Sequence, residues 1–358
     1  MNYKSEIINR AIKNQFTLIA EIGVNYYDIA SKERITLMSA ARKMIDEAKN
    51  AGIHAVKFQS YKASTLASKN SPSYWDLTEE STTSQFELFK KFDVFGQEEY
   101  RELKKYCDYV GIEFLSTAFD FESVDYLDEI MDVYKISSSD LNNIPFVIYQ
   151  AKKNKPMIVS TGASTFEEIQ KTLLEIRKYN MQPIILMHCV LEYPTPYDHA
   201  NLNKIVSLKE RFKDVIIGYS DHTKPDKSAD IIKTAYNLGA VVVEKHFTLD
   251  KTLKGNDHYH SMDPNDGTNI IEGIEFINKI RGNYDLTYLD TEIKSRLNAR
   301  RSIVSKEMIS KGAVVTEEMF IYKRPGTGLA PDQLKEILGK KALVKIEGDE
   351  IIKREMFE

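Results

Sequence analysis

Residues 215–223 read VIIGYSDHT and residues 241–248 read VVVEKHFT, with one helical stretch between them. Each segment is a short apolar run that ends in polar residues and a histidine. Short apolar runs that alternate with helices are typical of parallel strands in a βα-repeat protein. Neighbouring strands lie about 5 Å apart. We therefore expect the imidazoles of His222 and His246 to lie close enough to bind one divalent cation.

Six further apolar runs extend this pattern along the chain. The eight strand candidates are 17–23, 55–60, 112–117, 133–138, 156–162, 184–189, 215–221 and 241–247. Eight βα units in about 280 residues predict an α/β fold, a (β/α)8 or TIM barrel, over residues 1–282. A doubly wound open sheet is the alternative, but no GxGxxG motif follows the first run. We expect the insertion 61–97 to form part of a rim over the barrel mouth, and 254–267 to be a polar loop.

The periodicity changes after residue 282. Residues 283–297 resemble a linker, and residues 298–358 mix short strands, glycine turns and one brief helix. This mixture is too irregular for another βα unit. It predicts a separate small β-rich domain.

Composition limits the possible partners and location of the protein. The chain has 358 residues with a net charge of −4, and no basic block indicates binding to nucleic acid or to a membrane surface. Its polar start is unlike a signal peptide, and no apolar run approaches the roughly 20 residues that span a bilayer. Cys107 and Cys189 are the only cysteines, which argues against a disulfide framework. These features predict a soluble cytoplasmic protein.

Polar side chains end nearly every predicted strand. In a TIM barrel, the active site lies at these carboxyl ends. The residues concerned are Glu21 and Asn25, Lys57 and Gln59, Ser116 and Thr117, Lys135 and Ser138, Ser160 and Thr161, His188 and Cys189, Asp221 and His222, Lys245 and His246, and then Asp257 in the loop. Buried polar groups need partners, so a set of this size predicts a functional site.

Two kinds of chemistry are expected in this set. Lys57 and Lys135, with the nearby hydroxyl groups, form a wall that suits a phosphate or a carboxylate. The histidine pair suits a divalent transition metal or magnesium, with positions left open for a substrate oxygen. Glu21 and Asp257 are candidates to hold metal-bound water. The alternatives are that the histidines only cap their strands and that the lysines extend to solvent.

Nine segments in order along the chain resemble the sialic acid synthase (N-acetylneuraminate synthase) family, which includes legionaminic and pseudaminic acid synthases. They are AEIGVN (20–25), KFQS (57–60), FLSTAFD (114–120), YKISSSD (134–140), STG (160–162), HCVLEYPTP (188–196), GYSDHT (218–223), EKHFT (244–248) and KRPGTG (323–328). The resemblance implies a TIM barrel followed by a small antifreeze-like β-clip domain, called SAF, at 298–358.

The resemblance also implies a reaction and a set of roles. The family condenses phosphoenolpyruvate with an N-acetylated amino sugar aldehyde, giving a nine-carbon 2-keto sugar acid and phosphate by C–O cleavage. The resemblance implies that His222 and His246 bind Mn²⁺ or Mg²⁺, and that the catalytic residues are Glu21, Lys57, Lys135 and Asp257. The residues that would bind phosphoenolpyruvate are Lys57, Thr117, Lys135, Ser138, Ser160 and Thr161. Those that would bind the sugar are Gln59, Tyr193 and Asp257. The resemblance further implies a domain-swapped homodimer in which Arg324 of one chain reaches the sugar in the other. On sequence alone, Arg324 is equally compatible with a turn.

This chain departs from the family pattern where the acceptor sugar should lie. Val190 and Leu191 replace the usual threonine and small polar residue, and Tyr26 replaces a histidine. A substrate hydroxyl beside Leu191 would be buried without a partner. We therefore hypothesise an acceptor with fewer hydroxyl groups than N-acetylmannosamine, such as a 6-deoxy diacetamido sugar.

Two other functions compete with this interpretation. Another phosphoenolpyruvate-dependent synthase, making a 3-deoxy sugar acid phosphate, would need an additional basic site for its sugar phosphate. A non-catalytic protein that binds a carbohydrate or another partner through its tail would carry flat threonine or alanine faces there. The tail instead carries charges, at Lys306, Lys311, Glu317 and Glu318.

Overall fold

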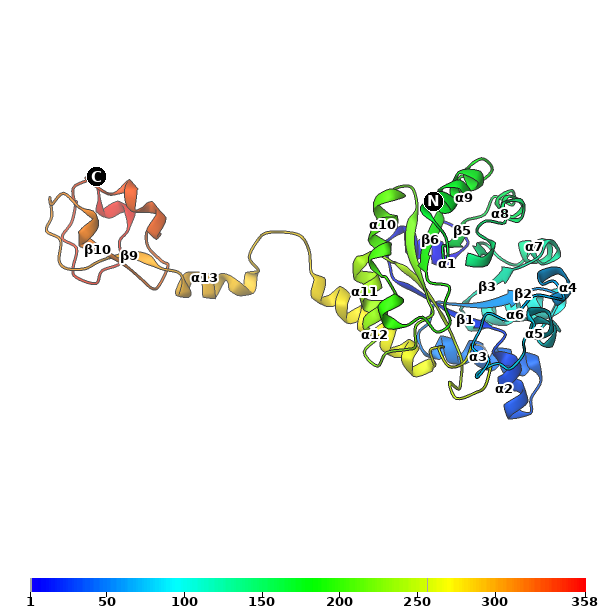
Figure 1. Ribbon diagram of the computed structural model, residues 1–358. Coiled ribbons are helices and arrows are strands. Elements are labelled where there is room, and N and C mark those ends of the chain that lie inside the picture. The colour runs from blue at the N-terminus through cyan, green and yellow to red at the C-terminus, as the bar shows by residue number, and fades with distance from the viewer. Residues whose placement is uncertain (1, 256) are drawn as a thin grey trace. The chain divides into compact units, whose positions relative to one another are not determined.

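The computed structural model describes residues 2–255 and 257–358, and its first part is a parallel barrel (Figure 1). The strands are β1 (Thr17–Gly23), β2 (Ala55–Ser60), β3 (Glu113–Ala118), β4 (Tyr134–Ile136), β5 (Met157–Ser160), β6 (Ile184–Cys189), β7 (Ile216–Asp221) and β8 (Val242–His246). They follow the order β3-β2-β1-β8-β7-β6-β5-β4, and β3 and β4 lie in contact to complete the ring. The predicted TIM barrel is confirmed.

Helices accompany the barrel strands; most of them cover the outside of the barrel, and two lie in the insertion 61–97 after β2 (Figure 1). They are α1 (Glu6–Ile12), α2 (Tyr26–Glu33), α3 (Leu37–Asn50), α4 (Ala63–Leu66), α5 (Gln85–Lys91), α6 (Gln97–Val110), α7 (Phe121–Asp128), α8 (Ile144–Ala151), α9 (Phe166–Arg177), α10 (Asn203–Arg211), α11 (Asp230–Leu238) and α12 (Pro264–Arg281). In α3, the buried residues Ala41, Met44, Ile45 and Ala48 recur at helical spacing, so one face packs on the strands. No helix within the described ranges is both long and apolar enough to cross a bilayer.

Several segments differ from the boundaries that the sequence predicts: the strand predicted at 156–162 ends at Ser160, and the predicted linker 283–297 contains the 3-10 helix Asp290–Glu292 and the start of a helix at Ile293. Ser138 lies in a short 3-10 helix, Ser138–Asp140, and not in β4, because the chain turns where its hydroxyl accepts a hydrogen bond from the amide of Gly162 at 2.9 Å. The predicted loop 254–267 is shorter, since α12 begins at Pro264, a residue favoured in the first turn of a helix. Residue 256 of that loop lies outside the described residues.

The second compact unit begins at Gly282, and the first ends at Arg281. It contains α13 (Ile293–Ala299), β9 (Ser302–Ser305) and β10 (Phe320–Lys323), with the two strands paired antiparallel. Its 3-10 helices are Asp290–Glu292, Glu317–Met319, Pro331–Glu336 and Arg354–Met356. Ile303, Phe320, Ile346 and Phe357 belong to a hydrophobic core separate from that of the barrel. This unit is small and β-rich, as its irregular sequence pattern indicates.

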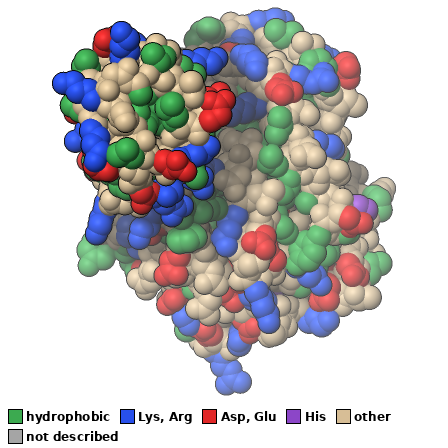
Figure 2. Space-filling model, turned by 90° about the vertical axis from the view of Figure 1, so that its left-hand side faces the viewer, with side chains coloured by type: hydrophobic (Ala, Val, Ile, Leu, Met, Phe, Trp, Pro, Cys, Tyr) green, Lys and Arg blue, Asp and Glu red, His purple; other side chains and the backbone are tan. Residues whose placement is uncertain are grey.

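Side chains of both charge signs are distributed over the surface. On the face shown in Figure 2, Lys and Arg are intermixed with Asp and Glu. This pattern fits the small net charge of the chain.

The strand register places the polar residues of the barrel at one level. In the parallel pairings, Glu21 is the partner of Lys57 on one side and of His246 on the other. Gln59 is the partner of Thr117. Because parallel strands hold neighbouring residues within a few ångströms, these side chains from three sheet pairings converge at the carboxyl end of the barrel.

A histidine joins β1 to the start of β2 in the barrel. The backbone amide of Leu18 donates to Nδ1 of His54 at 3.1 Å, and the amide of His54 donates to the carbonyl of Leu18 at 3.1 Å. Burial, with the charges of Arg10 and Lys49, lowers the pKa of His54 from its ordinary 6.5 to about 4. The imidazole therefore accepts this bond in its neutral form.

This histidine should make the stability of the barrel depend on pH. Between pH 6.5 and 4, the unfolded chain holds a proton on His54 that the folded chain lacks, so the free energy of unfolding falls as the pH drops through this window. The contribution is about 2–3 kcal/mol. The His54→Asn variant keeps an acceptor for Leu18, and its free energy of unfolding in urea should fall less between pH 7 and 4 than that of the parent.

The exposed His199 provides a matched control. The His199→Asn variant should retain the loss of stability toward pH 4. Equal pH dependence in His54→Asn and the parent would contradict the assignment to His54.

Candidate active site

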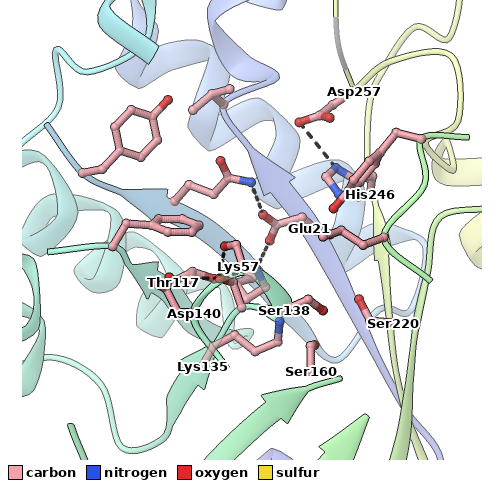
Figure 3. Close-up of a pocket in the computed structure, with 18 of the residues that line it drawn as sticks. Glu21, Lys57, Thr117, Lys135, Ser138, Asp140, Ser160, Ser220, His246 and Asp257 are labelled. Atoms are coloured by element: carbon pink, nitrogen blue, oxygen red, sulfur yellow. Dashed lines mark hydrogen bonds and ion pairs between the residues drawn. The ribbon is translucent and has the colours of Figure 1, made fainter. Parts of the chain in front are cut away.

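A cavity of about 420 Å³ opens at the carboxyl ends of the barrel strands (Figure 3). The predicted residues that line it are Glu21, Lys57, Gln59, Thr117, Lys135, Ser138, Ser160, Tyr193, His222, His246 and Asp257. The segment 61–97 adds Leu66, Tyr74, Gln85, Leu88, Phe89 and Phe92, so this insertion does form a wall of the cavity, as its position after β2 predicts.

Thr161 does not line the cavity, and Arg324 belongs to the second unit. Thr161 is buried beside the cavity, where its hydroxyl donates to the carbonyl of Met187 at 2.9 Å. Arg324 is exposed and belongs to the second unit.

Lys57 is the centre of the polar network in the cavity (Figure 3). Its ammonium lies 2.5 Å from Oε2 of Glu21 and donates to the hydroxyl of Thr117 at 2.8 Å. The amide of Gln59 donates to Oε1 of Glu21 at 2.9 Å. The sequence places these four residues on β1, β2 and β3, and the structure connects them in one buried network.

Glu244 is a site residue that the sequence analysis missed. Its Oε1 lies 3.3 Å from the ammonium of Lys135 and 3.7 Å from that of Lys57, and it accepts a bond from Ser220 at 3.3 Å. Side chains two apart on a strand point to the same face, and Glu244 stands two residues before His246. This alternation was the signal that could have identified it.

Alternation also explains why Lys245 and Asp221 do not line the cavity. Lys245 points to the opposite face of β8 from His246. There its ammonium lies 2.6 Å from Asp221, which also accepts from Tyr219 at 2.9 Å. The ammonium attraction outweighs burial and lowers the pKa of Asp221. This buried pair is part of the packing of β7 and β8.

Burial and charge shift the pKa values of the ionisable groups in the cavity. Burial raises the pKa of Glu21 to about 7 even though Lys57 opposes it. Burial disfavours the charged form of Lys57, but Glu21 and Glu244 outweigh it and its pKa is raised. For Lys135 burial prevails and the pKa is lowered. Two ammonium groups thus share two carboxylates, and a bound anion would find positive charge without water to screen it.

Three histidines and one aspartate form a second cluster at the same end of the barrel. The ring centroids of His222 and His246 are 5.4 Å apart, and those of His246 and His260 are 4.9 Å apart. Nδ1 of His246 lies 3.6 Å from Oδ2 of Asp257 (Figure 3). One ligand atom from each of His246, Asp257 and His260 lies within 4.8 Å of the others.

This donor set fits a divalent cation. Nδ1 of His222 donates to the carbonyl of Val190 at 2.8 Å, which fixes the tautomer and leaves Nε2 with a lone pair for a ligand. Nδ1 of His246 is buried and has no hydrogen-bond partner in the part of the chain that the structure describes. Burial lowers the pKa of His246 and of His260 far below the ordinary value and raises the pKa of Asp257 to about 6. The imidazoles of His246 and His260 are therefore neutral, which is the form that binds metals. Burial opposes the charged form of His222, but Cys189 and the carbonyl of Val190 outweigh it and raise the pKa of His222.

Other departures from the expected motif have structural explanations. Tyr26 is fully buried and packs against Phe58 and Phe95 at ring distances of 5.9 and 4.9 Å, so it belongs to the core and not to the cavity. Leu191 does line the cavity.

Comparison with known proteins agrees with this geometry. The model of the NeuB family matches residues 44–285, and the model of the SAF domain matches residues 300–358. The chain belongs to the NeuB family. The expected likeness to sialic acid synthases with a C-terminal SAF domain is confirmed.

Individual relatives match almost the whole chain. An uncharacterized protein of Methanocaldococcus jannaschii is 38% identical over 94% of this chain and 92% of its own length. The N,N'-diacetyllegionaminic acid synthase of Campylobacter jejuni is 36% identical over 94% of this chain and 98% of its own length. Among solved structures, the N-acetylneuraminic acid synthetase of Leptospira borgpetersenii is 32% identical with a TM-score of 0.67, and the match covers 78% of this chain and 90% of that one.

The shared carboxylate of Glu244 should contribute strongly to stability. In a Glu244→Gln variant, Lys57 and Lys135 lose the negative charge that lies near both. Removing one partner of a buried ion pair costs about 3–5 kcal/mol, and we expect the lower value because Gln preserves the shape. Urea unfolding measures this loss, and added inorganic phosphate should reduce it by binding the folded state.

The exposed Glu210, on α10, provides the matched control. The Glu210→Gln variant should change the free energy of unfolding by less than about 0.5 kcal/mol. Equal stability of the two variants would contradict the role assigned to Glu244.

Proposed function

We propose that this protein condenses phosphoenolpyruvate with an N-acetylated amino sugar in its open aldehyde form, releasing phosphate and a nine-carbon 2-keto sugar acid. The observation that carries the proposal is the junction of two clusters in one cavity, the Lys57–Lys135 wall and the histidine–aspartate group. The relatives support it, since two proteins similar over 90% and 94% of this chain are named as synthases of such a sugar acid.

The lysine wall would hold phosphoenolpyruvate. Lys57 and Lys135 supply positive charge, and the hydroxyls of Thr117, Ser138 and Ser160 supply directed donors around them. The buried carboxylates of Glu21 and Glu244 lie beside these ammonium groups and offset part of their charge. We propose that substrate oxygens replace these carboxylates as partners of the ammonium groups, and that the lysines then stabilise the departing phosphate.

The chemistry forms one carbon–carbon bond and one bond from a water oxygen to C2, and the two protons of that water go to the aldehyde oxygen and to the departing phosphate. C3 of phosphoenolpyruvate bonds to the aldehyde carbon, water adds at C2, and the bond from C2 to the phosphate oxygen breaks. A cation held by His222 and His246 would polarise the aldehyde oxygen as a Lewis acid. Glu21 lies on β1 between Lys57 and His246, and we propose that it takes the proton of the attacking water. Asp257 would orient the sugar, and Gln59 and Tyr193 would contact it.

Part of the cavity lining is apolar and suits an apolar part of the acceptor. Leu66, Leu88, Phe89, Phe92 and Leu191 line it, and their side chains offer no hydrogen bond. A sugar hydroxyl buried against them would lose its water without a replacement, whereas a methyl group would gain from burial. We therefore propose a 6-deoxy diacetamido acceptor rather than N-acetylmannosamine. The legionaminic acid synthase named above is consistent with this choice.

The oligomeric part of the proposal concerns Arg324. We propose that the second unit of one chain covers the barrel of another in a domain-swapped homodimer, and that Arg324 contacts the acetamido group there. An Arg324→Ala variant should lower kcat/KM for the acceptor and leave the KM for phosphoenolpyruvate nearly unchanged. A monomer in light scattering at assay concentration would contradict this arrangement.

The reaction itself can be tested by phosphate release. Purified protein with manganese and phosphoenolpyruvate should release phosphate in the presence of a deoxy diacetamido sugar, and a chelator should abolish the release. The mass of the product should equal that of the acceptor plus pyruvate. Absence of release with every acceptor, from folded protein, would contradict the proposed reaction. A far higher kcat/KM for N-acetylmannosamine would contradict only the proposed acceptor.

Leu191 should influence the choice of acceptor. In a Leu191→Thr variant, a hydroxyl becomes available at the cavity wall, and the ratio of kcat/KM for the deoxy sugar to that for N-acetylmannosamine should fall by about tenfold. The Leu174→Thr variant makes the same change on the exposed side of α9 and should leave the ratio unchanged. An unchanged ratio in Leu191→Thr would remove Leu191 from the acceptor contacts.

A further inference from the structure

We propose that His260 supplies a third imidazole ligand to the divalent cation, beside His222 and His246. The inference rests on the metal-dependent reaction proposed above and adds a residue that neither strand position nor motif indicates. His260 comes from the loop after β8 and not from a strand end, and its ring lies 4.9 Å from that of His246 and 6.3 Å from that of His222.

The hydrogen bonding of His260 is incomplete in a way that a ligand would correct. The side chain is fully buried, and among residues 2–255 and 257–358 neither Nδ1 nor Nε2 finds a hydrogen-bond partner. Leaving a buried polar group unpaired costs about 1–3 kcal/mol. Within the described residues, Nε2 has Oδ1 of Asp257 at 4.0 Å, which is beyond hydrogen-bonding distance. Nitrogen atoms in this condition are suited to accept a bond from a cation.

Two other buried histidines of the barrel have hydrogen-bond partners for their ring nitrogens. His258, two residues earlier in the same loop, places Nδ1 at 2.8 Å from the hydroxyl of Thr248 and Nε2 at 3.1 Å from Asp28. His188 places Nε2 at 2.8 Å from the carbonyl of Ala200. Both therefore have hydrogen-bond partners that account for their burial. His260 has none, so its nitrogens are better explained by a ligand than by packing.

The position of His260 agrees with ligation. One of its nitrogens lies within 4.8 Å of a ligand atom of His246 and of one of Asp257, and these two also lie within 4.8 Å of each other. This group of three does not include His222, and donors up to 4.8 Å apart must move closer together before each lies about 2.0–2.2 Å from one cation. An additional neutral imidazole favours transition metals over magnesium, which prefers oxygen ligands. We therefore expect tight binding of Mn²⁺ and a weak response to Mg²⁺.

A variant that keeps an aromatic ring at position 260 separates the packing role of this side chain from its proposed role as a metal ligand. The ring of His260 contacts Tyr193 and Tyr259 with centroid distances of 5.6 and 5.1 Å, so an aromatic ring at this position is part of the packing. Phenylalanine keeps a ring and removes both nitrogens. A His260→Phe variant should fold, and its melting temperature without metal should not fall below that of the parent, because two unpaired polar atoms are lost.

The test measures binding of Mn²⁺ alone, by titration calorimetry and by the loss of the free-ion EPR signal. The dissociation constant of His260→Phe should rise at least about tenfold, since even outer-shell partners of metal ligands are worth that much. The stabilisation that Mn²⁺ gives in thermal melts should shrink in parallel. His199→Phe, at an exposed histidine, is the matched control and should bind Mn²⁺ as the parent does.

The possible results separate this inference from the proposed function. Equal Mn²⁺ affinity in folded His260→Phe and the parent would make His260 a packing residue and leave the reaction proposal intact. A parent protein that binds no Mn²⁺ would overturn the metal-dependent function itself. Should the variant fail to fold, pulsed EPR of Mn²⁺ on parent protein with ¹⁵N-labelled histidine counts the imidazole ligands. Three imidazole ligands would support the inference, and two would overturn it.

Discussion

The arrangement of the barrel interior depends on the burial of two ammonium groups beside two carboxylates. Lys57 and Lys135 are almost completely enclosed, as are Glu21 and Glu244. An isolated ion moved into such a site would lose several kcal/mol of hydration, so each charge requires the others. The pairs are kept in place by strands β1, β2, β4 and β8, and closing the barrel is what brings these four strands around one point. The closure of the barrel and the pairing of these buried charges therefore depend on each other.

Much of this could be predicted because it follows from local rules. Apolar runs alternating with helical stretches indicate a TIM barrel, and the carboxyl ends of its strands collect the functional side chains. Lys57, Thr117, Lys135 and His246 were found in this way, and all of them line the cavity. The second unit was recognisable because its periodicity fails where the barrel pattern ends.

The residues that escaped prediction depend on side-chain direction and on loop conformation. Glu244 lies inside an apolar run, and its direction follows from the alternation that places His246 in the cavity. Lys245 lies at a strand end, as predicted, but its side chain points to the opposite face of β8 from His246 and pairs with Asp221. His260 sits in a loop whose path no periodicity describes. Only the three-dimensional structure places its ring beside that of His246.

The charged residues and the apolar residues of the cavity come from different parts of the chain, and these parts differ in how well they tolerate substitution. The strands supply lysines, carboxylates and histidines, whose positions are fixed by register and by mutual charge compensation, so a change at one of them leaves a buried charge unpaired. The apolar wall comes from the segment 61–97 and from Leu191 after β6, where no such compensation exists. Substitution there alters shape and hydration but not the balance of charge. It follows that acceptor preference can vary among proteins with this barrel while the handling of phosphoenolpyruvate stays constant, because only the second is tied to the stability of the fold.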